Sequence, residues 1–199
     1  EYIRNFIMSK LETNTIDTIS GTNTLTLGSS NLSTINMASG VSPGTGMGKI
    51  LQVVHGSTST ETTIQSTTFA DTTLSASITP SSTSSKVLIL ISQQGRLRLF
   101  STAELNSEMR ILRDSTVIYT KGVTLNTRSG TGASGANDHG SSVAIQYLDS
   151  PNTTSQITYK TQGKVDTTSP NNAKVTFQLT SSNNSVSGSS EITLMEVSG

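Results

Sequence analysis

A short aliphatic segment constrains the fold of this chain more than any other feature. Residues 87–91 (VLILI) form an unbroken run of five large aliphatic side chains, and the run includes β-branched residues. A run of this length and composition fits a strand better than a helix. The sequence therefore predicts a short strand that is buried on both faces and lies at the centre of the core.

The segment before this run has a different pattern. Residues 74–78 (LSASI) alternate apolar and polar side chains, which is typical of a strand with one solvated face, and Pro80 with the Ser/Thr cluster up to Ser85 separates the two strands. A strand that is covered on both faces needs a second layer behind it. That layer is either another sheet of the same chain or another copy of the chain.

Residues 49–199 have the pattern of a body made of short strands. Alternating or apolar segments occur at 50–54, 74–78, 87–91, 96–100, 109–111, 117–119, 143–147, 157–159, 175–179 and 192–194. About ten short strands separated by Gly, Asn, Ser and Pro predict an all-β fold, an antiparallel β-sandwich or jelly roll.

The apolar content suggests that this core is shared between subunits. Only 32% of the residues are hydrophobic, against roughly 45–50% in average globular proteins. Subunits with so little apolar surface often complete their burial in an oligomer. The closing strand, residues 191–197 (EITLMEV), is apolar on both faces near its end and suits a position beside a trimer axis. We therefore expect a homotrimer.

The first 48 residues have a different sequence pattern and divide into two segments. In residues 1–13, apolar side chains at three- and four-residue spacing predict a short amphipathic helix that attaches to another protein or bundles with its copies; a fraying terminus is the alternative. Residues 14–48 contain three blocks that each open with Asn, followed by a Gly/Pro hinge at 41–48. We expect an intertwined β stalk there, with a disordered Ser/Thr linker as the alternative. Residues 49–199 then form the knob.

Charge and motif content argue against several classes of function. Thirteen basic and 13 acidic residues balance, which predicts neither a nucleic-acid nor a membrane partner, and the chain has no Cys. The two histidines, His55 and His139, lie in Gly/Ser-rich surroundings, and no GxSxG elbow is present. Asp138 beside His139 lacks further metal ligands nearby. We therefore expect no catalytic, cofactor-binding or metal-binding residues.

The candidate for recognition is a long Gly-rich segment. Residues 124–142 (TLNTRSGTGASGANDHGSS) predict a structureless loop, and loops of this length in compact domains are usually functional or disordered. The candidate receptor contacts, whose polar side chains suit a host glycan or protein surface, are Asn126, Arg128, Asn137, Asp138 and His139. A mobile loop without a ligand is the alternative.

The repeat segment (TIDTISGTNTLTLGSS), the Gly-rich joint, GKILQVVHGSTST, SITPSSTSSKVLILIS and the closing EITLMEV together carry a resemblance. They resemble the tail-fibre and virion-appendage proteins of tailed bacteriophages, particularly marine and cyanobacterial phages. The resemblance implies a trimeric stalk, a β-sandwich knob that binds the host surface or decorates the particle, and a location on the virion. Two hypotheses follow: a receptor-binding fibre, or a capsid decoration or head fibre that is purely structural. In both, the N-terminal segment contacts other virion proteins, and attachment to the tail and to the capsid both stay open.

Overall fold

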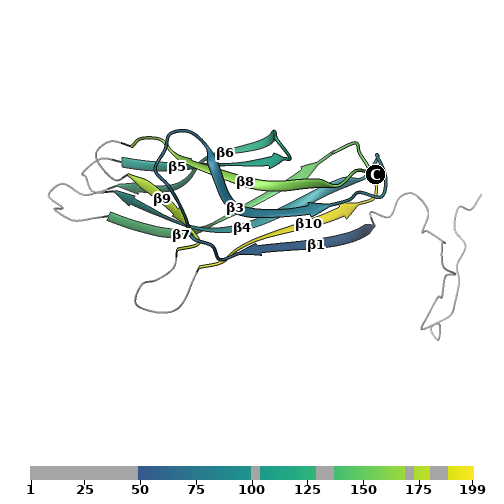
Figure 1. Ribbon diagram of the computed structural model, residues 1–199, viewed down its shortest axis with the longest axis horizontal. Coiled ribbons are helices and arrows are strands. Elements are labelled where there is room, and N and C mark those ends of the chain that lie inside the picture. Colours follow the sequence, from purple (N-terminus) through teal and green to yellow (C-terminus); the bar gives the residue numbers. More distant parts are fainter. Residues whose placement is uncertain (1–48, 100–103, 129–136, 169–172, 180–187) are drawn as a thin grey trace, which may run out of the picture. The chain divides into compact units, whose positions relative to one another are not determined.

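The computed structural model describes residues 49–99, 104–128, 137–168, 173–179 and 188–199, which form two antiparallel β-sheets packed face to face (Figure 1). The prediction of an all-β sandwich is confirmed. The predicted attachment segment, residues 1–13, and the predicted stalk and hinge, residues 14–48, lie outside the described residues. Within the described part of the chain, no helix is long and apolar enough to span a membrane.

The larger sheet, called sheet A, is organised around one long strand. This strand, β4 (Lys86–Leu99), pairs with β7 along one edge, and along its other edge with β10 over residues 86–92 and with β9 over residues 95–98. Beyond them β1 pairs with β10 and β2 pairs with β9. The bounds of these strands are β1 Ile50–Thr58, β2 Thr62–Ile64, β7 Asn137–Asp149, β9 Lys174–Phe177 and β10 Ser190–Val197.

The smaller sheet, called sheet B, covers the inner face of sheet A. Its strand order is β3-β8-β5-β6, and all of its pairs are antiparallel. The bounds are β3 Ala70–Ile78, β5 Glu104–Arg113, β6 Thr116–Arg128 and β8 Ile157–Val165. Alternation along β3 and β8 turns one side chain in two towards sheet A, so each sheet needs only one apolar face. This explains how a chain with few apolar residues still builds a continuous core.

The aliphatic run does lie in the core, but it is not buried on both faces. Val87, Ile89 and Ile91 are buried between the sheets, whereas Leu88 and Leu90 point outwards and are partly exposed. The prediction was wrong on this point because an apolar outer face has the same sequence pattern as a covered one. The strand predicted at residues 96–100 is not separate from the one predicted at residues 87–91, since β4 continues without a break to Leu99.

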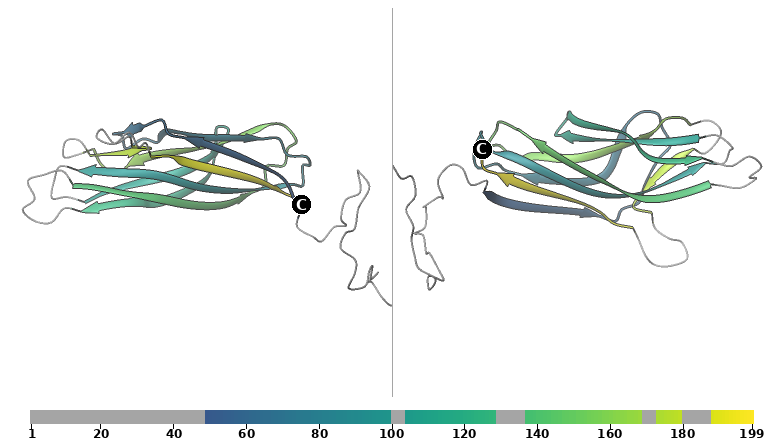
Figure 2. Two further views of the ribbon diagram at one scale, coloured as in Figure 1. Left: turned by 90° about the horizontal axis from the view of Figure 1, so that it is seen from below. Right: turned by 180° about the vertical axis from the view of Figure 1, so that it is seen from behind.

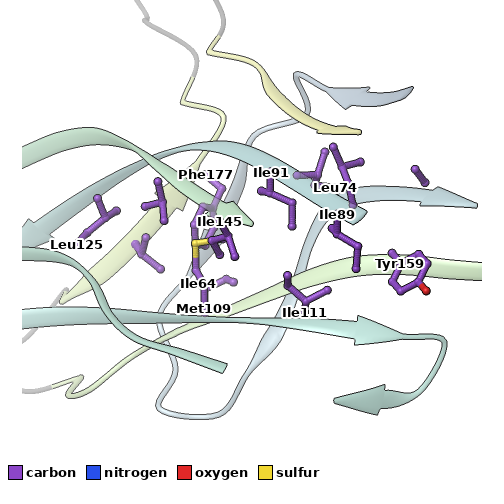
Figure 3. Packing of buried hydrophobic residues seen from close by; sticks show 14 of the residues in the cluster. Ile64, Leu74, Ile89, Ile91, Met109, Ile111, Leu125, Ile145, Tyr159 and Phe177 are labelled. Atoms are coloured by element: carbon purple, nitrogen blue, oxygen red, sulfur yellow. The ribbon is translucent and has the colours of Figure 1, made fainter. Parts of the chain in front are cut away.

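An aromatic ring and two glycines fix the distance between the sheets. Phe177 is fully buried and lies among Ile64, Ile145 and Met109 (Figure 3). A Cβ atom on Gly163 of β8 would lie 2.7 Å from the Phe177 ring, and one on Gly95 of β4 would lie 2.8 Å from Leu125 of β6. Only a residue without a side chain leaves enough room for the facing side chain at these positions.

The closing strand, β10, is not apolar on both faces near its end as predicted. The prediction placed apolar side chains on both faces near its end, but the side chain that points inwards there is Glu196, which is fully buried. Met195 and Val197 point outwards and are partly exposed. The strand is therefore covered on one face within this chain.

The first and the last strand of the sandwich, β1 and β10, bring Lys49 and Ser198 to the same end of the sandwich. The Ser198 amide donates to the Lys49 carbonyl at 2.9 Å, and Val197 pairs with both Ile50 and Lys86. We call this the proximal end, and the opposite end, where Leu99 pairs with Asn137, the distal end (Figures 1 and 2). The 14 residues of β4 connect the two ends, which at about 3.3 Å per residue are about 43 Å apart.

Candidate recognition surface

The structure places the five candidate contact residues on strands rather than on a loop. β6 extends to Arg128 and β7 begins at Asn137, so the prediction of a structureless loop over 124–142 is wrong for 124–128 and for 137–142. Residues 129–136 lie outside the described part. The error arose because Gly, Ser and Thr, which are typical of loops, also occupy exposed positions of the two strands, such as Ser141 and Ser142.

All five residues nevertheless lie at the distal end, two on sheet B and three on sheet A. Asn126 and Arg128 lie at the end of the pairing between β6 and β5, where Asn126 faces Asn106 and Arg128 faces Glu104. Asn137, Asp138 and His139 pair with the last residues of β4, and the His139 side chain is exposed. The candidate surface thus spans the distal ends of both sheets.

Asn126 belongs to a polar cluster that sequence analysis did not identify. Its side-chain amide donates to the Glu104 carboxylate at 2.7 Å and to the Asn106 side-chain carbonyl at 2.6 Å. Asn106 in turn donates from its side chain to Asp166 at 2.8 Å and from its backbone amide at 3.1 Å. Outward alternation along β5 is the signal that could have found Asn106, whereas Asp166 comes close only through the pairing of β5 with β8.

Polar and charged side chains also occupy the middle of the outer face of sheet B. Asp71 accepts hydrogen bonds from Gln162 at 2.6 Å and from Lys160 at 3.0 Å, and Arg110 donates to Gln162 at 2.8 Å. The bond from Gln162, followed by the interactions with Lys160, lowers the pKa of Asp71 despite the opposing effect of partial burial. Lys164 and Glu108 form a further ion pair at 3.1 Å. This face is built to remain in water.

A buried charge lies between the sheets near the proximal end. Asp149 accepts from the Tyr159 hydroxyl at 2.7 Å and from the Arg113 guanidinium at 2.8 Å. Burial, followed by the hydrogen bond to Asp149, raises the pKa of Tyr159 far above its ordinary value, so the hydroxyl stays protonated and donates. Both partners of Asp149 donate to its carboxylate, which indicates a structural role for the group.

A second buried carboxylate fixes the segment between β3 and β4. Glu196 accepts from the Gln52 side chain at 2.6 Å, and from the Ser81 hydroxyl at 2.6 Å and backbone amide at 2.7 Å. Burial alone would raise the pKa of Glu196, but these hydrogen bonds outweigh it and lower the pKa to about 2. The ionised form is therefore the form that the fold stabilises.

We expect this carboxylate to make the sandwich sensitive to acid. Since the folded pKa of about 2 lies below the ordinary value of 4.5 for a Glu side chain, protonation favours the unfolded state, and stability falls as the pH drops from about 5 towards 2. Urea unfolding at several pH values measures this slope, and Glu196→Gln should be less stable at pH 7 and flatten the slope. An equally steep slope in the variant would contradict this role for Glu196.

The two histidines lie on different strands of sheet A. His55 lies on β1, where its Nδ1 atom is 3.4 Å from the Thr193 hydroxyl, and His139 lies at the distal end. Within the described ranges, no group of three His, Asp or Glu side chains is placed to hold a metal ion.

Comparison with known proteins gives matches only among solved structures. No protein-family model and no curated protein matches the sequence. The crystal structure of the infectious bursal disease virus VP2 subviral particle is similar, with 14% identity and a TM-score of 0.35, over 74% of this chain and 37% of that chain. Structures of the Gt and Gx strains of the same virus each show 12% identity, with TM-scores of 0.32 and 0.33 over 73% and 74% of this chain. The chain spans 40% of the length of each of these two.

Proposed function

We propose that this chain is a structural component of a bacteriophage virion, a trimeric fibre whose β-sandwich knob binds the host cell surface during adsorption. The observation that carries the proposal is the separation of the two ends of the sandwich. The chain enters at Lys49 at the proximal end, whereas the candidate contact residues, from Asn126 to His139, lie at the distal end. A knob attached through residues 1–48 would thus present these residues away from its attachment point. The resemblance of the sequence to tail-fibre proteins supports the same arrangement.

The chemistry of the distal end favours a neutral, hydroxyl-rich ligand such as a glycan. The exposed cluster around Asn126 offers carboxylate and amide groups of Glu104, Asn106 and Asp166, which accept and donate hydrogen bonds at short spacing. Carboxylates would repel an anionic ligand, whereas they accept hydrogen bonds from sugar hydroxyls.

A capsid decoration or head fibre without receptor binding is the second candidate. One observation favours it: the hydrogen bonds of Asn106 and Asn126 are already made within the protein. A surface whose polar groups are satisfied by their neighbours gains less from a ligand. Both candidates place the chain on the surface of the particle.

A triple substitution at the distal end separates the two candidates. We expect Arg128→Ala with Asp138→Ala and His139→Ala to reduce binding of the full chain to host cells, because the candidate contacts are removed. His139 is exposed, and exposed substitutions usually change stability by less than about 0.5 kcal/mol, so the thermal unfolding temperature should stay close to that of the parent. Adsorption of labelled protein to host cells gives the measurement.

The matched control lies at the other end of the sandwich. Lys86→Ala with Gln156→Ala removes exposed polar side chains at the proximal end and should leave cell binding unchanged. If both variants bind as the parent does while the chain is found on purified particles, the decoration function is supported. If the chain is absent from particles, the virion assignment itself is wrong.

A further inference from the structure

The outer faces of the two sheets differ in chemistry. Sheet B carries the ion pairs of Asp71 with Lys160 and of Glu108 with Lys164 on its outer face. Large exposed apolar side chains instead gather on sheet A, at Ile50, Leu51, Val53 and Leu148; the other two in the described residues, Val117 and Val123, lie on the edge strand β6. Covering the outer face of sheet B would desolvate charged groups, whereas covering that of sheet A would remove apolar surface from water.

Strand register aligns these apolar side chains into one row. Val53 pairs with Met195, Met195 pairs with Leu88, and Leu88 pairs with Leu148, so the row crosses the strands β1, β10, β4 and β7. Val53 and Leu148, at its two ends, are 57% and 50% exposed. Side chains that face one another on adjacent strands are about 4.5–5.5 Å apart, so the row is continuous. We call it the apolar row.

The surface beside the apolar row is uncharged and slightly hollowed. The next row of paired residues is His55, Thr193, Leu90 and Gln146. A shallow hollow of about 180 Å³ extends from this row to Glu191, with Leu90, Gln146 and Thr193 also in its lining. Charges appear only on either side of the two rows, with Lys86 at one limit and Glu191 at the other, and they are of opposite sign. Two copies of this face therefore do not repel each other.

We infer that the outer face of sheet A around the apolar row is where copies of this chain contact one another. Four strands about 4.8 Å apart and seven residues of about 3.3 Å each give the face a projected area of about 440 Å². A stable interface buries about 800 Å² per partner, so this face supplies about half of the requirement. The remainder must come from the rest of the outer face of sheet A, which β4 continues beyond Ser92 to Leu99.

This inference names the contact surface of the trimer in the proposed function, but its test is independent of virion location and host binding. The chain has no Cys, so a single introduced Cys reports on its own surroundings. Val53→Cys and Leu148→Cys probe the face, and Val123→Cys is the matched control, since Val123 is 59% exposed on sheet B. Maleimide labelling of the full chain at micromolar concentration, with sedimentation of the same samples, gives the readout.

We expect Cys at 53 and at 148 to react about tenfold more slowly than Cys at 123, since only the dissociated fraction is reactive, and to lose this protection on dilution. Adding Leu148→Lys to the Val53→Cys chain should restore fast labelling, because it places a charge on the face, whereas adding Val123→Lys should not. Circular dichroism verifies that each variant is folded.

Three results would overturn the inference. Equal labelling at all three positions in an oligomer would place the contact elsewhere. Protection at 53 and 148 in a chain that sediments as a monomer would mean that residues 1–48 of the same chain cover the face. Fast labelling of the isolated protein, with protection only on particles, would assign the face to another virion protein.

Discussion

Ile89→Asp should abolish folding of the sandwich. Ile89 is fully buried in the first half of β4 and points towards sheet B, where Ile111 and Tyr159 lie (Figure 3). An unpaired carboxylate at such a site costs several kcal/mol, which is comparable to a total stability of about 5–15 kcal/mol. Circular dichroism and the yield of soluble full chain measure the effect.

The control for this substitution is Val123→Asp, which introduces the same carboxylate at a position that is 59% exposed on β6. It should fold and change the free energy of unfolding by less than about 0.5 kcal/mol. A folded, soluble Ile89→Asp chain would show that β4 does not form the centre of the core.

Asp149→Ala should give the second largest loss of stability. The substitution leaves the buried Tyr159 hydroxyl without its acceptor and the Arg113 guanidinium without its carboxylate. Breaking a buried pair by removing one partner costs about 3–5 kcal/mol. For a domain of this size the unfolding temperature should fall by roughly 6–20 °C, which differential scanning calorimetry measures.

A double-mutant cycle tests the cause of that loss. Tyr159→Phe removes only the hydroxyl, so in the parent it should cost about 1.5–3 kcal/mol, the usual net value of a hydrogen bond to a charged group. In the Asp149→Ala background the same change should be neutral or stabilising, because it removes an unsatisfied buried donor. Equal effects of Tyr159→Phe in both backgrounds would mean that the contact with Asp149 contributes nothing.

The sequence predicted those parts of the fold in which burial alternates along a strand. Residues 74–78 and 157–159 were expected as strands, and they lie in β3 and β8 with one buried face each. The short strand β2 was missed, because three residues such as Thr62–Ile64 are too few to show a period. The break expected within β4 was also wrong: Gly95 suits the strand because a Cβ there would lie 2.8 Å from Leu125.

The sequence did not predict where the fold places the candidate contact residues, which stay a prediction as a site. Asn126 and His139 do lie at one end of the sandwich, yet the strand pairing that brings them there connects residues far apart in the sequence, such as His139 with Leu97. A single sequence does not specify which strands will be neighbours. The acceptors around Asn126 were missed for the same reason, since Asp166 comes close to it only through Asn106.

The way the chain enters the sandwich also determines how it bears mechanical load. A force that pulls Lys49 away from the distal end acts along the axis of β1, which is paired with β10 at eight positions, and β10 is paired with β4 at seven. Hydrogen bonds between antiparallel strands lie perpendicular to the strands, so this force loads the bonds in shear. Shear requires many bonds to break together rather than one after another. A sandwich held at its distal end would therefore resist a pull on Lys49 along the direction in which its strands are strongest.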